Sequence, residues 1–347
     1  MYKRQEQEHI ISRLNPELKY QVKSSLNYPE DSAGRIMSRD FVSIPDNWTV
    51  REARQYLLNN EELPDDFYTI FLVDEKTLKP TGEIALDKLL RAKGDEKLNS
   101  IMDGEIVPVD VYTDQEEVAH MFREYGWMSA MVVDNKGRLI GVINIDDVVE
   151  IVHEETNEDM MLLTGAESND VYRSVFSIFK SRSIWLVTNL FATIVAASVV
   201  GEFQDIIAQL SILAVLMPIV ASMGGTTGQQ TLAVVVRSLA TKELNSRNAL
   251  RMIGKEFMVG LCNGLLFAVM IGIAVRIWFP GQEMISYIIA LAMLCNLTVA
   301  SLAGILIPLT INRLKIDPAI ASGVFLIACT DSGGYFIFLG LAKLLLF

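Results

Sequence analysis

Residues 284–312, MISYIIALAMLCNLTVASLAGILIPLTIN, contain no charged side chain in 29 consecutive positions. A helix crosses the hydrocarbon core of a bilayer with about 20 apolar residues, so this stretch predicts a membrane-spanning helix. Four similar runs lie in the same half of the chain: Ile184–Gly201, Ile206–Val236, Phe257–Val275 and Pro318–Ala342, of which only the last is interrupted, by Asp331. Five spans are therefore expected, because buried helices of a soluble protein would need a very large core around them.

The charge of the chain is divided unevenly between its two halves. Of 347 residues, 42 are acidic and 30 are basic, and residues 184–347 hold only seven of those acids and nine of those bases. An acidic front half repels phosphate, which excludes a nucleic-acid binder. Cys262, Cys295 and Cys329 lie in the apolar half without a Cys-x-x-Cys spacing. Neither a disulfide framework nor a zinc site is expected.

The basic loops predict the orientation in the membrane. The loop after the second run is rich in bases, namely Arg237, Lys242, Arg247, Arg251 and Lys255. The loop after the first run carries only Glu202 and Asp205. Because basic loops stay in the cytosol, we expect an inner or plasma membrane protein with a cytosolic amino terminus and an outer carboxyl terminus. The polar start, Met1–Glu6, agrees, since it resembles no signal peptide.

A polar stretch interrupts the second span. Residues 218–231 read PIVASMGGTTGQQT. Proline and paired glycines weaken a helix, and freed backbone groups at membrane depth are tolerated only against protein or water. Gly224 and Gly228 also have the spacing of close small-residue helix packing. The polar cluster from Thr226 to Thr231 favours a water-filled pathway.

Asp331 is the acid that interrupts the last run. A carboxylate there costs roughly 3 kcal/mol or more and marks an ion pathway by default. The alternative is a protonated or Lys-paired structural aspartate, but no base lies deep in any span. A twofold axis would supply two carboxylates, which with hydroxyl and carbonyl oxygens suit a largely hydrated Mg²⁺. We therefore expect a homodimer with its pore on or near the axis.

The first half contains an internal repeat. Each copy has the order Ile-Met, strand, helix, strand ending in Val-Asp, turn, strand and helix. The first copy includes Ile36-Met37 and Val73-Asp74, and the second includes Ile101-Met102 and Val133-Asp134. A repeat of this kind outweighs local predictions of single elements. The pattern resembles a tandem pair of CBS domains, which usually form one compact α/β module and sense ligands.

Nucleotide binding stays open in one repeat. Many CBS repeats bind adenine nucleotides through a Ser or Thr after Gly-x-x and an Asp three residues later. The second repeat reads GVINIDD over residues 141–147, with Asn144 at the hydroxyl position. The first reads GEIALDK over residues 82–88 and lacks both groups. This partial match leaves a nucleotide site open in the second repeat and argues against one in the first.

An acid-dense helix follows the second repeat. Asp147, Glu150, Glu154 and Glu158 are spaced to share one helical face. Like charges so placed repel one another. A solvated surface is the simplest interpretation. Because the run connects to the spans, divalent ions that bridge it would make it a sensor.

Together these motifs resemble the MgtE family of magnesium channels and transporters, from about Asn27 to the end of the chain. The most specific stretches are residues 28–37 (YPEDSAGRIM), the CBS pair, residues 218–230 and residues 317–331. The resemblance implies a homodimer in the lipid bilayer and a pore lined by spans two and five, with its carboxylate at Asp331. The candidate lining residues are Pro218, Gly224, Gly225, Thr226, Gly228, Gln229 and Thr330.

The resemblance also implies gating by cytosolic Mg²⁺, which is then both transported and regulatory. The acidic sensor positions that bind Mg²⁺ fall on Asp147, Glu150, Glu155, Glu158 and Asp159. Loss of the bridging ions would let the acids repel one another, spread the connectors and open the pore.

The chain departs from the family pattern in two places. The family usually carries a helical domain before the CBS pair, and only Ile10–Asn27 resembles its tail, so weaker or shifted gating is expected. The family usually has Gly-Gly-Asn-x-Gly-Asn-Gln where residues 224–230 read GGTTGQQ. Thr226 and Gln229 thus replace two asparagines, which leaves Mn²⁺ and Co²⁺ open as alternative ions.

The predicted function is Mg²⁺ uptake down the electrochemical gradient. Two charges moving through about 100 mV gain roughly 4.6 kcal/mol, so no ATPase subunit is implied, and no Walker motif is present. An enzyme is not expected, since an intramembrane aspartyl protease would need a second membrane aspartate. A divalent-cation transporter of different selectivity and a membrane-anchored CBS sensor that transports nothing remain the alternatives.

The predicted fold class is an α-helical membrane protein with five transmembrane helices, preceded by a cytosolic α/β tandem CBS module. The expected segments are a short helical remnant at 1–32, CBS repeats at 33–95 and 96–153, a connecting plug helix at 154–183 and the five-helix pore domain at 184–347.

Overall fold

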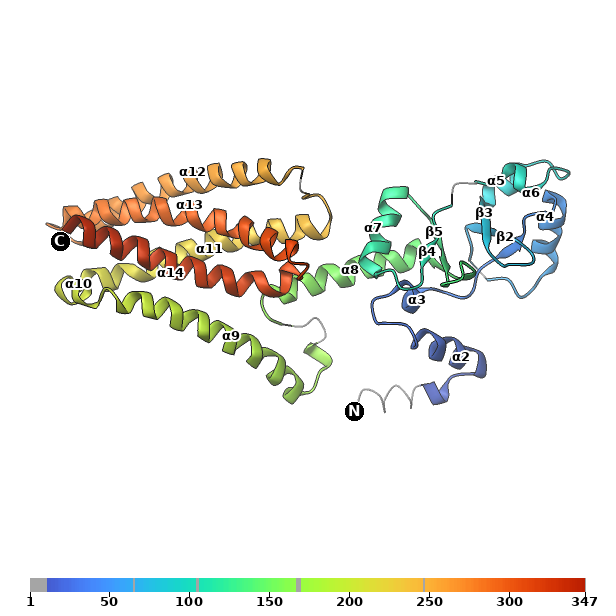
Figure 1. Cartoon of the computed structure of the whole chain (residues 1–347), viewed down its shortest axis with the longest axis horizontal. Coiled ribbons are helices and arrows are strands. Elements are labelled where there is room, and N and C mark those ends of the chain that lie inside the picture. The colour runs from blue at the N-terminus through green and yellow to red at the C-terminus, as the bar shows by residue number, and fades with distance from the viewer. Residues whose placement is uncertain (1–10, 65, 104–105, 167–169, 246, 347) are drawn as a thin grey trace. The chain divides into compact units, whose positions relative to one another are not determined.

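A computed structural model describes residues 11–64, 66–103, 106–166, 170–245 and 247–346 (Figure 1). The chain divides into two compact units, Met1–Thr156 and Asn157–Phe347. The first is α/β and the second is helical. The fold class predicted from the sequence is confirmed, since five long apolar helices follow two matching α/β repeats.

The first unit contains two matching three-stranded sheets in its described part. In each sheet the first strand pairs parallel with the second, and the second pairs antiparallel with the third. The strands are β1 (Ser43–Pro45), β2 (Thr69–Val73), β3 (Pro80–Ala85), β4 (Val109–Asp110), β5 (Ser129–Val133) and β6 (Leu139–Asn144). The helices are α2 (Pro16–Ser25), α3 (Ala33–Ile36), α4 (Val50–Asn59), α5 (Leu86–Arg91), α6 (Leu98–Ile101), α7 (Gln115–Tyr125) and α8 (Ile145–Leu162).

The helices of the repeats start and stop at sequence signals. Thr49 and Glu52 form a reciprocal capping box at the start of α4, in which each side chain accepts a hydrogen bond from the other's backbone N–H. Asp114 caps α7, and Gly126 ends it in the left-handed conformation at φ 67°. These local signals fix the helix that packs on each sheet.

The two repeats exchange their first segments. The N–H of Gly34 in α3 donates to the carbonyl of Val111 (2.8 Å), so the segment before the first repeat packs on the second. Leu98 in α6 belongs correspondingly to the core of the first repeat. A Cβ at Gly141 would meet the sulfur of Met37 at 2.6 Å, and the sulfur of Met102 covers Gly82 equivalently at 2.5 Å. Each hydrophobic core therefore combines most of one sequence repeat with the first segment of the other, so the cores do not follow the boundaries 33–95 and 96–153.

The second unit is built from long helices that follow the predicted runs. Its elements are the 3₁₀ helix η1 (Asp170–Tyr172), α9 (Val175–Gly201), α10 (Gln204–Gln209), α11 (Ile212–Ala240), α12 (Ala249–Trp278), α13 (Glu283–Arg313) and α14 (Pro318–Leu346). Within the described residues, five helices are long and apolar enough to cross a membrane, as predicted. The helices and the uncharged runs differ at two places. The first helix begins at Val175, before the run that starts at Ile184, and Ile206 belongs to the separate α10.

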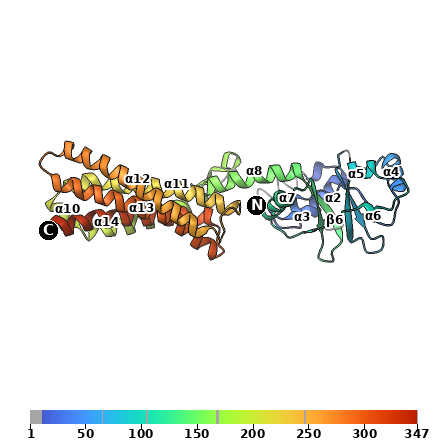
Figure 2. The same ribbon diagram turned by 90° about the horizontal axis from the view of Figure 1, so that it is seen from above.

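Helix α13 is the centre of the bundle, and residues along most of its length are buried against α11, α12 and α14 (Figure 2). Helix α9 lies at the edge, where its main neighbour is α14. The largest core cluster joins the ends of α11, α13 and α14 farthest from the basic loops, around Leu216, Ile288 and Phe338. The carboxyl-terminal helix is therefore held between the centre and the edge of the bundle.

The connector is not one helix over 154–183. Helix α8 starts inside the second repeat at Ile145 and ends at Leu162, and a turn through Gly165 (φ 71°) follows it. After η1, Ser174 caps α9 by accepting a hydrogen bond from the N–H of Ser177. Positive φ favours glycine, which explains why the chain reverses at that residue.

Candidate functional site

Asp331 lies near the middle of α14 and is half-buried. The preceding residue, Thr330, is 1% exposed, and its hydroxyl donates to the carbonyl of Leu326 in its own helix (3.0 Å). Among the residues that the structure describes, none forms a hydrogen bond or ion pair with the Asp331 carboxylate. A carboxylate at this depth needs water, a cation or a second chain to compensate its charge.

Helix α11 passes through the polar stretch without a break. Residues 212–240 are continuously helical despite Pro218 and the paired glycines, so the helix is not interrupted as the composition suggested. Its outward side carries Pro218, Thr226 and Gln229. The Thr226 hydroxyl donates to the carbonyl of Ser222 (2.9 Å). The polar groups of this side thus lie on a regular helical surface.

The buried side of α11 is a close-packed face of small residues. A Cβ added at Gly224 would collide with the amide of Asn296, which donates to the carbonyl of Val220 (2.7 Å). A Cβ at Gly228 would meet Leu326 of α14 at 2.9 Å. Both glycines therefore pack against neighbouring helices, as small-residue contacts do in membranes.

The predicted lining residues thus divide into two groups. Pro218, Thr226 and Gln229 are exposed in the single chain, whereas Gly224, Gly228 and Thr330 are buried. Gly225 belongs to neither group. It is partly exposed, and a Cβ there would approach only the Thr330 hydroxyl, at 4.0 Å. Helices α11 and α14 therefore adjoin beside Asp331.

Glu256 is a buried acid that the sequence analysis missed. It lies in α12 with 8% exposure, and its carboxylate accepts a hydrogen bond from the Thr231 hydroxyl of α11 (2.9 Å). The apolar run was read as beginning at the next residue. A signal was present, since Glu256 is in phase with the buried Gly260, Gly264 and Ala268 at intervals of four residues.

The acidic connector is partly engaged inside the protein. In the first unit, Glu155 accepts a hydrogen bond from the Gln115 amide (2.6 Å), and Asp147 accepts one from the Asn144 N–H (3.3 Å). Burial, with a smaller contribution from Asp146 and Glu150, raises the pKa of Asp147. The predicted acids Glu150 and Glu158 are exposed.

Asp159 meets an acid that was not predicted as a site. Burial is the main cause that raises the pKa of Asp159 to about 6, and the carboxylates of Asp317 and Glu158 add to it. Asp317 lies just before α14 and accepts a hydrogen bond from the Ala319 N–H (2.8 Å). The end of α8 and the start of α14 thus bring two like charges together. No group of three or more metal-ligating His, Cys, Asp or Glu side chains occurs within the described ranges.

Asn144 makes contacts within its own repeat. Its side-chain oxygen accepts a hydrogen bond from the Ser129 hydroxyl (2.7 Å), and its N–H donates to Asp147. The two motif positions of the second repeat are therefore adjacent. Nucleotide binding there stays a prediction.

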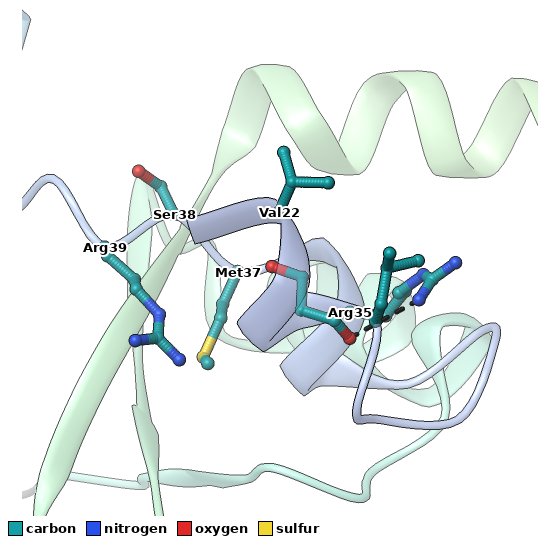
Figure 3. A pocket seen from close by; sticks show the side chains of 7 residues that line it. Val22, Arg35, Met37, Ser38 and Arg39 are labelled. Atoms are coloured by element: carbon teal, nitrogen blue, oxygen red, sulfur yellow. Dashed lines mark hydrogen bonds between the residues drawn. The ribbon is translucent and has the colours of Figure 1, made fainter. Parts of the chain in front are cut away.

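A cavity of about 380 Å³ lies between α2 and the segment after α3 (Figure 3). Figure 3 shows the guanidinium groups of Arg35 and Arg39 pointing to opposite sides of it. Arg35 donates to the carbonyl of Ser25 (3.4 Å), and Arg39 lies 6.0 Å from the ring centre of Tyr20. The two arginines hold α2 in place and do not converge on one anion.

Comparison with known families and proteins identifies both units. The CBS domain family matches residues 33–95 and 98–154, and the MgtE family, described as divalent cation transporters, matches residues 217–341. The chain is 33% identical to the magnesium transporter MgtE of Enterococcus faecalis over 93% of its own length and 71% of that protein. The chain belongs to the MgtE family. The MgtE of Bacillus subtilis is 30% identical over 92% of this chain and 71% of its own length.

Membership of the MgtE family confirms the predicted resemblance and makes the chain an integral membrane transporter of Mg²⁺ and divalent cations, not an enzyme. Among solved structures, the cytosolic domain of the Mg²⁺ channel MgtE in complex with ATP is 32% identical, with a TM-score of 0.39, over 42% of this chain and 58% of that one. The CBS pair of a putative Mg²⁺ transporter from Shewanella oneidensis is 19% identical, with a TM-score of 0.38.

Proposed function

We propose that this MgtE-family protein conducts Mg²⁺ passively into the cell through a pore that contains Asp331. The observation that carries the proposal is the half-buried Asp331 carboxylate, which no described residue of the chain compensates. A permeating cation is the natural partner for a charge in that position. The membrane potential supplies the driving force, so transport needs no nucleotide hydrolysis.

Two copies of the chain form the pore in this proposal. A single Asp331 supplies one carboxylate, and Mg²⁺ usually keeps several waters while it contacts one or two carboxylates. A twofold axis beside α14 would place two Asp331 side chains around one hydrated ion. The exposed polar side of α11, with Thr226 and Gln229, would line the same pathway.

The CBS unit lies on the cytosolic side in this proposal, and the carboxyl terminus lies outside. The support is the loop between α11 and α12, which carries Arg237, Lys242, Arg247, Arg251 and Lys255.

Cytosolic Mg²⁺ closes the pore by bridging the acids of α8. Leu162 and Leu163, at the end of α8, pack on a cluster that includes Leu232 of α11 and Leu326 of α14. Close to this contact Asp159 meets Asp317, and their repulsion falls when a divalent cation bridges them. Loss of that ion would push the end of α8 away from the two helices that we propose line the pore. Asp147, Glu150, Glu155 and Glu158 belong to the same regulatory set.

The first experiment is Mg²⁺ flux into proteoliposomes that hold the wild type or Asp331→Ala. We expect flux that collapses in the variant and that falls as Mg²⁺ rises on the CBS side. Flux that depends on Asp331 but does not change with CBS-side Mg²⁺ would support the pore assignment and contradict the proposed gating. Flux unchanged by Asp331→Ala would refute the pore assignment, and no flux of any divalent cation would support a membrane-anchored CBS sensor instead.

The gate is tested by Asp159→Asn and Asp317→Asn, each measured for inhibition by CBS-side Mg²⁺. Both changes should weaken the dependence of flux on CBS-side Mg²⁺, because each removes the repulsion that would open the pore and one ligand of the ion that would close it. Glu154→Gln is the matched control, since Glu154 is an exposed acid of the same helix outside the proposed set. Equal effects in all three variants would indicate a general loss of negative charge rather than a site.

A different ion is the second candidate. Thr226 and Gln229 stand at the positions where the family pattern has asparagine, and both lie on the exposed side of α11. Flux of Mn²⁺ or Co²⁺ above that of Mg²⁺ in the wild type would favour this candidate. Thr226→Asn with Gln229→Asn should then restore Mg²⁺ preference.

A further inference from the structure

An apolar groove runs between α9 and α14. It has a volume of about 590 Å³. Helix α9 lines it from Ser181 to Val195, and α14 lines it from Ile320 to Ala328. The turn after α8 closes one end, where Trp185 covers Gly165 and lies 3.7 Å from the Cβ position of Gly323. All these residues belong to the second unit.

The groove has the length of one lipid leaflet. Fourteen residues of α9 separate Ser181 from Val195, which at 1.5 Å per residue corresponds to about 21 Å. One leaflet of a bilayer, headgroups included, is about 20–22 Å thick. Phe191 of α9 and Phe325 of α14 are exposed at its two rims, at 66% and 61%. An extended acyl chain along α9 would bury apolar surface from both helices.

The end of the groove at Ser181 is basic. Lys180 and Arg182 flank Ser181 in the sequence, and both are exposed. Asp170 accepts hydrogen bonds from Arg182 (2.8 Å) and from Arg173 (3.0 Å), so one carboxylate faces two guanidinium groups. Asp170 thus offsets the charge of Arg182, whereas Lys180 forms no ion pair with any described residue and supplies the positive charge available to a headgroup. Trp185, one turn farther along, is of the type enriched at the level of lipid headgroups.

We propose that this groove binds one anionic phospholipid, with its headgroup at Lys180 and an acyl chain between α9 and α14. Basic pockets between transmembrane helices on the cytosolic side recognise anionic headgroups, and the apolar groove accepts the chain. The bound lipid packs on the face of α14 that includes Ala328, three residues before Asp331. The lipid thereby contributes to the position of the helix that carries the membrane carboxylate.

The test is photocrosslinking of the full chain with benzoylphenylalanine in place of Phe191. The chain is reconstituted in vesicles of phosphatidylcholine and phosphatidylglycerol, and the mass of each adduct is measured. The matched control is benzoylphenylalanine at Leu265 of α12, which is 61% exposed and does not border the groove. We expect phosphatidylglycerol adducts at position 191 to exceed the vesicle ratio about fivefold, the factor for one net charge near the headgroup. Adducts at position 265 should follow the vesicle ratio.

Two variants separate the headgroup from the chain. Lys180→Gln should remove the enrichment but keep the adduct, whereas Lys255→Gln, an exposed base at the start of α12, should change neither. Ala192→Trp should reduce adducts of both lipids, because Ala192 is buried and lines the groove. If the two lipids form adducts at position 191 in the same ratio as in the vesicle, the groove makes only ordinary bilayer contact. That result would overturn the proposal. A doubled chain mass would show that a second copy occupies the groove, and no adduct at 191 beside normal labelling at 265 would show that it is closed. Both results would also overturn the proposal.

Discussion

The surroundings of Asp331 and Glu256 differ although both are acids of the helical unit. Glu256 is 8% exposed and accepts a hydrogen bond from a neighbouring helix, whereas Asp331 is half-buried and no described residue pairs with it. A buried carboxylate persists only where something offsets its desolvation. For Glu256 the protein supplies that group. We infer that Glu256 holds helices together and that Asp331 is left for an ion.

The largest expected effect is a difference in Mg²⁺ flux when each of the two acids is replaced by its neutral amide. Asp331→Asn should lower Mg²⁺ flux by about 100-fold, since losing the carboxylate that would hold the ion should raise the barrier by about 2.7 kcal/mol. Glu256→Gln should keep flux within about threefold, because the amide oxygen still accepts the Thr231 hydrogen bond. Flux into proteoliposomes at equal protein density measures both. Equal losses in the two variants would break the distinction.

The second prediction concerns the partner of Glu256. Thr231→Val leaves a buried carboxylate without its donor and should lower the free energy of unfolding by about 1.5–3 kcal/mol. Thr231→Ser should recover most of it. Thr227→Val is the control, since the Thr227 hydroxyl is also buried but bonds only to Met223 of its own helix. Denaturant unfolding in detergent gives the three values, and identical losses for Thr231→Val and Thr227→Val would contradict the helix-holding role.

A smaller effect distinguishes the two sides of α11. Gly224→Ala should destabilise the protein by about 1–3 kcal/mol, because the new methyl group displaces the Asn296 amide from Val220. Gly225→Ala should be near neutral, since its Cβ would approach only Thr330, at 4.0 Å. Thermal unfolding of the purified variants checks this order. The reverse order would mean that α11 packs through its other face.

The smallest effect is the pH dependence of Asp159. Its pKa is about 6 in the folded chain against 3.8 for an ordinary Asp, so the folded state binds this proton more tightly. Its contribution to stability is therefore present below about pH 4 and is lost as pH rises through 6. Above that pH the charged pair with Asp317 should bind Mg²⁺.

Thermal unfolding with and without Mg²⁺ at about pH 7.5 and about pH 5 tests this linkage. The shift in unfolding temperature that Mg²⁺ produces should be larger at the higher pH. Asp159→Asn should make the two shifts equal, whereas a wild type with equal shifts would refute the role of Asp159.

Much of the architecture could be predicted from charge and periodicity. The uncharged runs give five helices, and the Ile-Met and Val-Asp repeats give the two α/β repeats, because both signals are local in sequence. Helix ends were less certain. Helix α9 starts at Val175 because Ser174 caps it, and a count of uncharged residues starts after Arg182.

The residues of the candidate site that the sequence analysis did not find depend on contacts between residues distant in sequence. Glu256 was hidden because it follows Lys255 and precedes an apolar run, although its four-residue spacing with Gly260 places it on the buried face. Asp317 acquires a partner only when α8 ends beside the start of α14. The buried role of Gly224 required the position of Asn296, 72 residues later. No local pattern encodes such pairs.

The edge position of α9 also constrains how the bundle is made. Its main neighbour, α14, is the last helix of the chain. During synthesis α11, α12 and α13 follow α9 into the bilayer before its main partner exists. The face of α9 that later packs on α14 therefore contacts lipid until α14 is inserted. The groove between α9 and α14 thus forms in the presence of lipid.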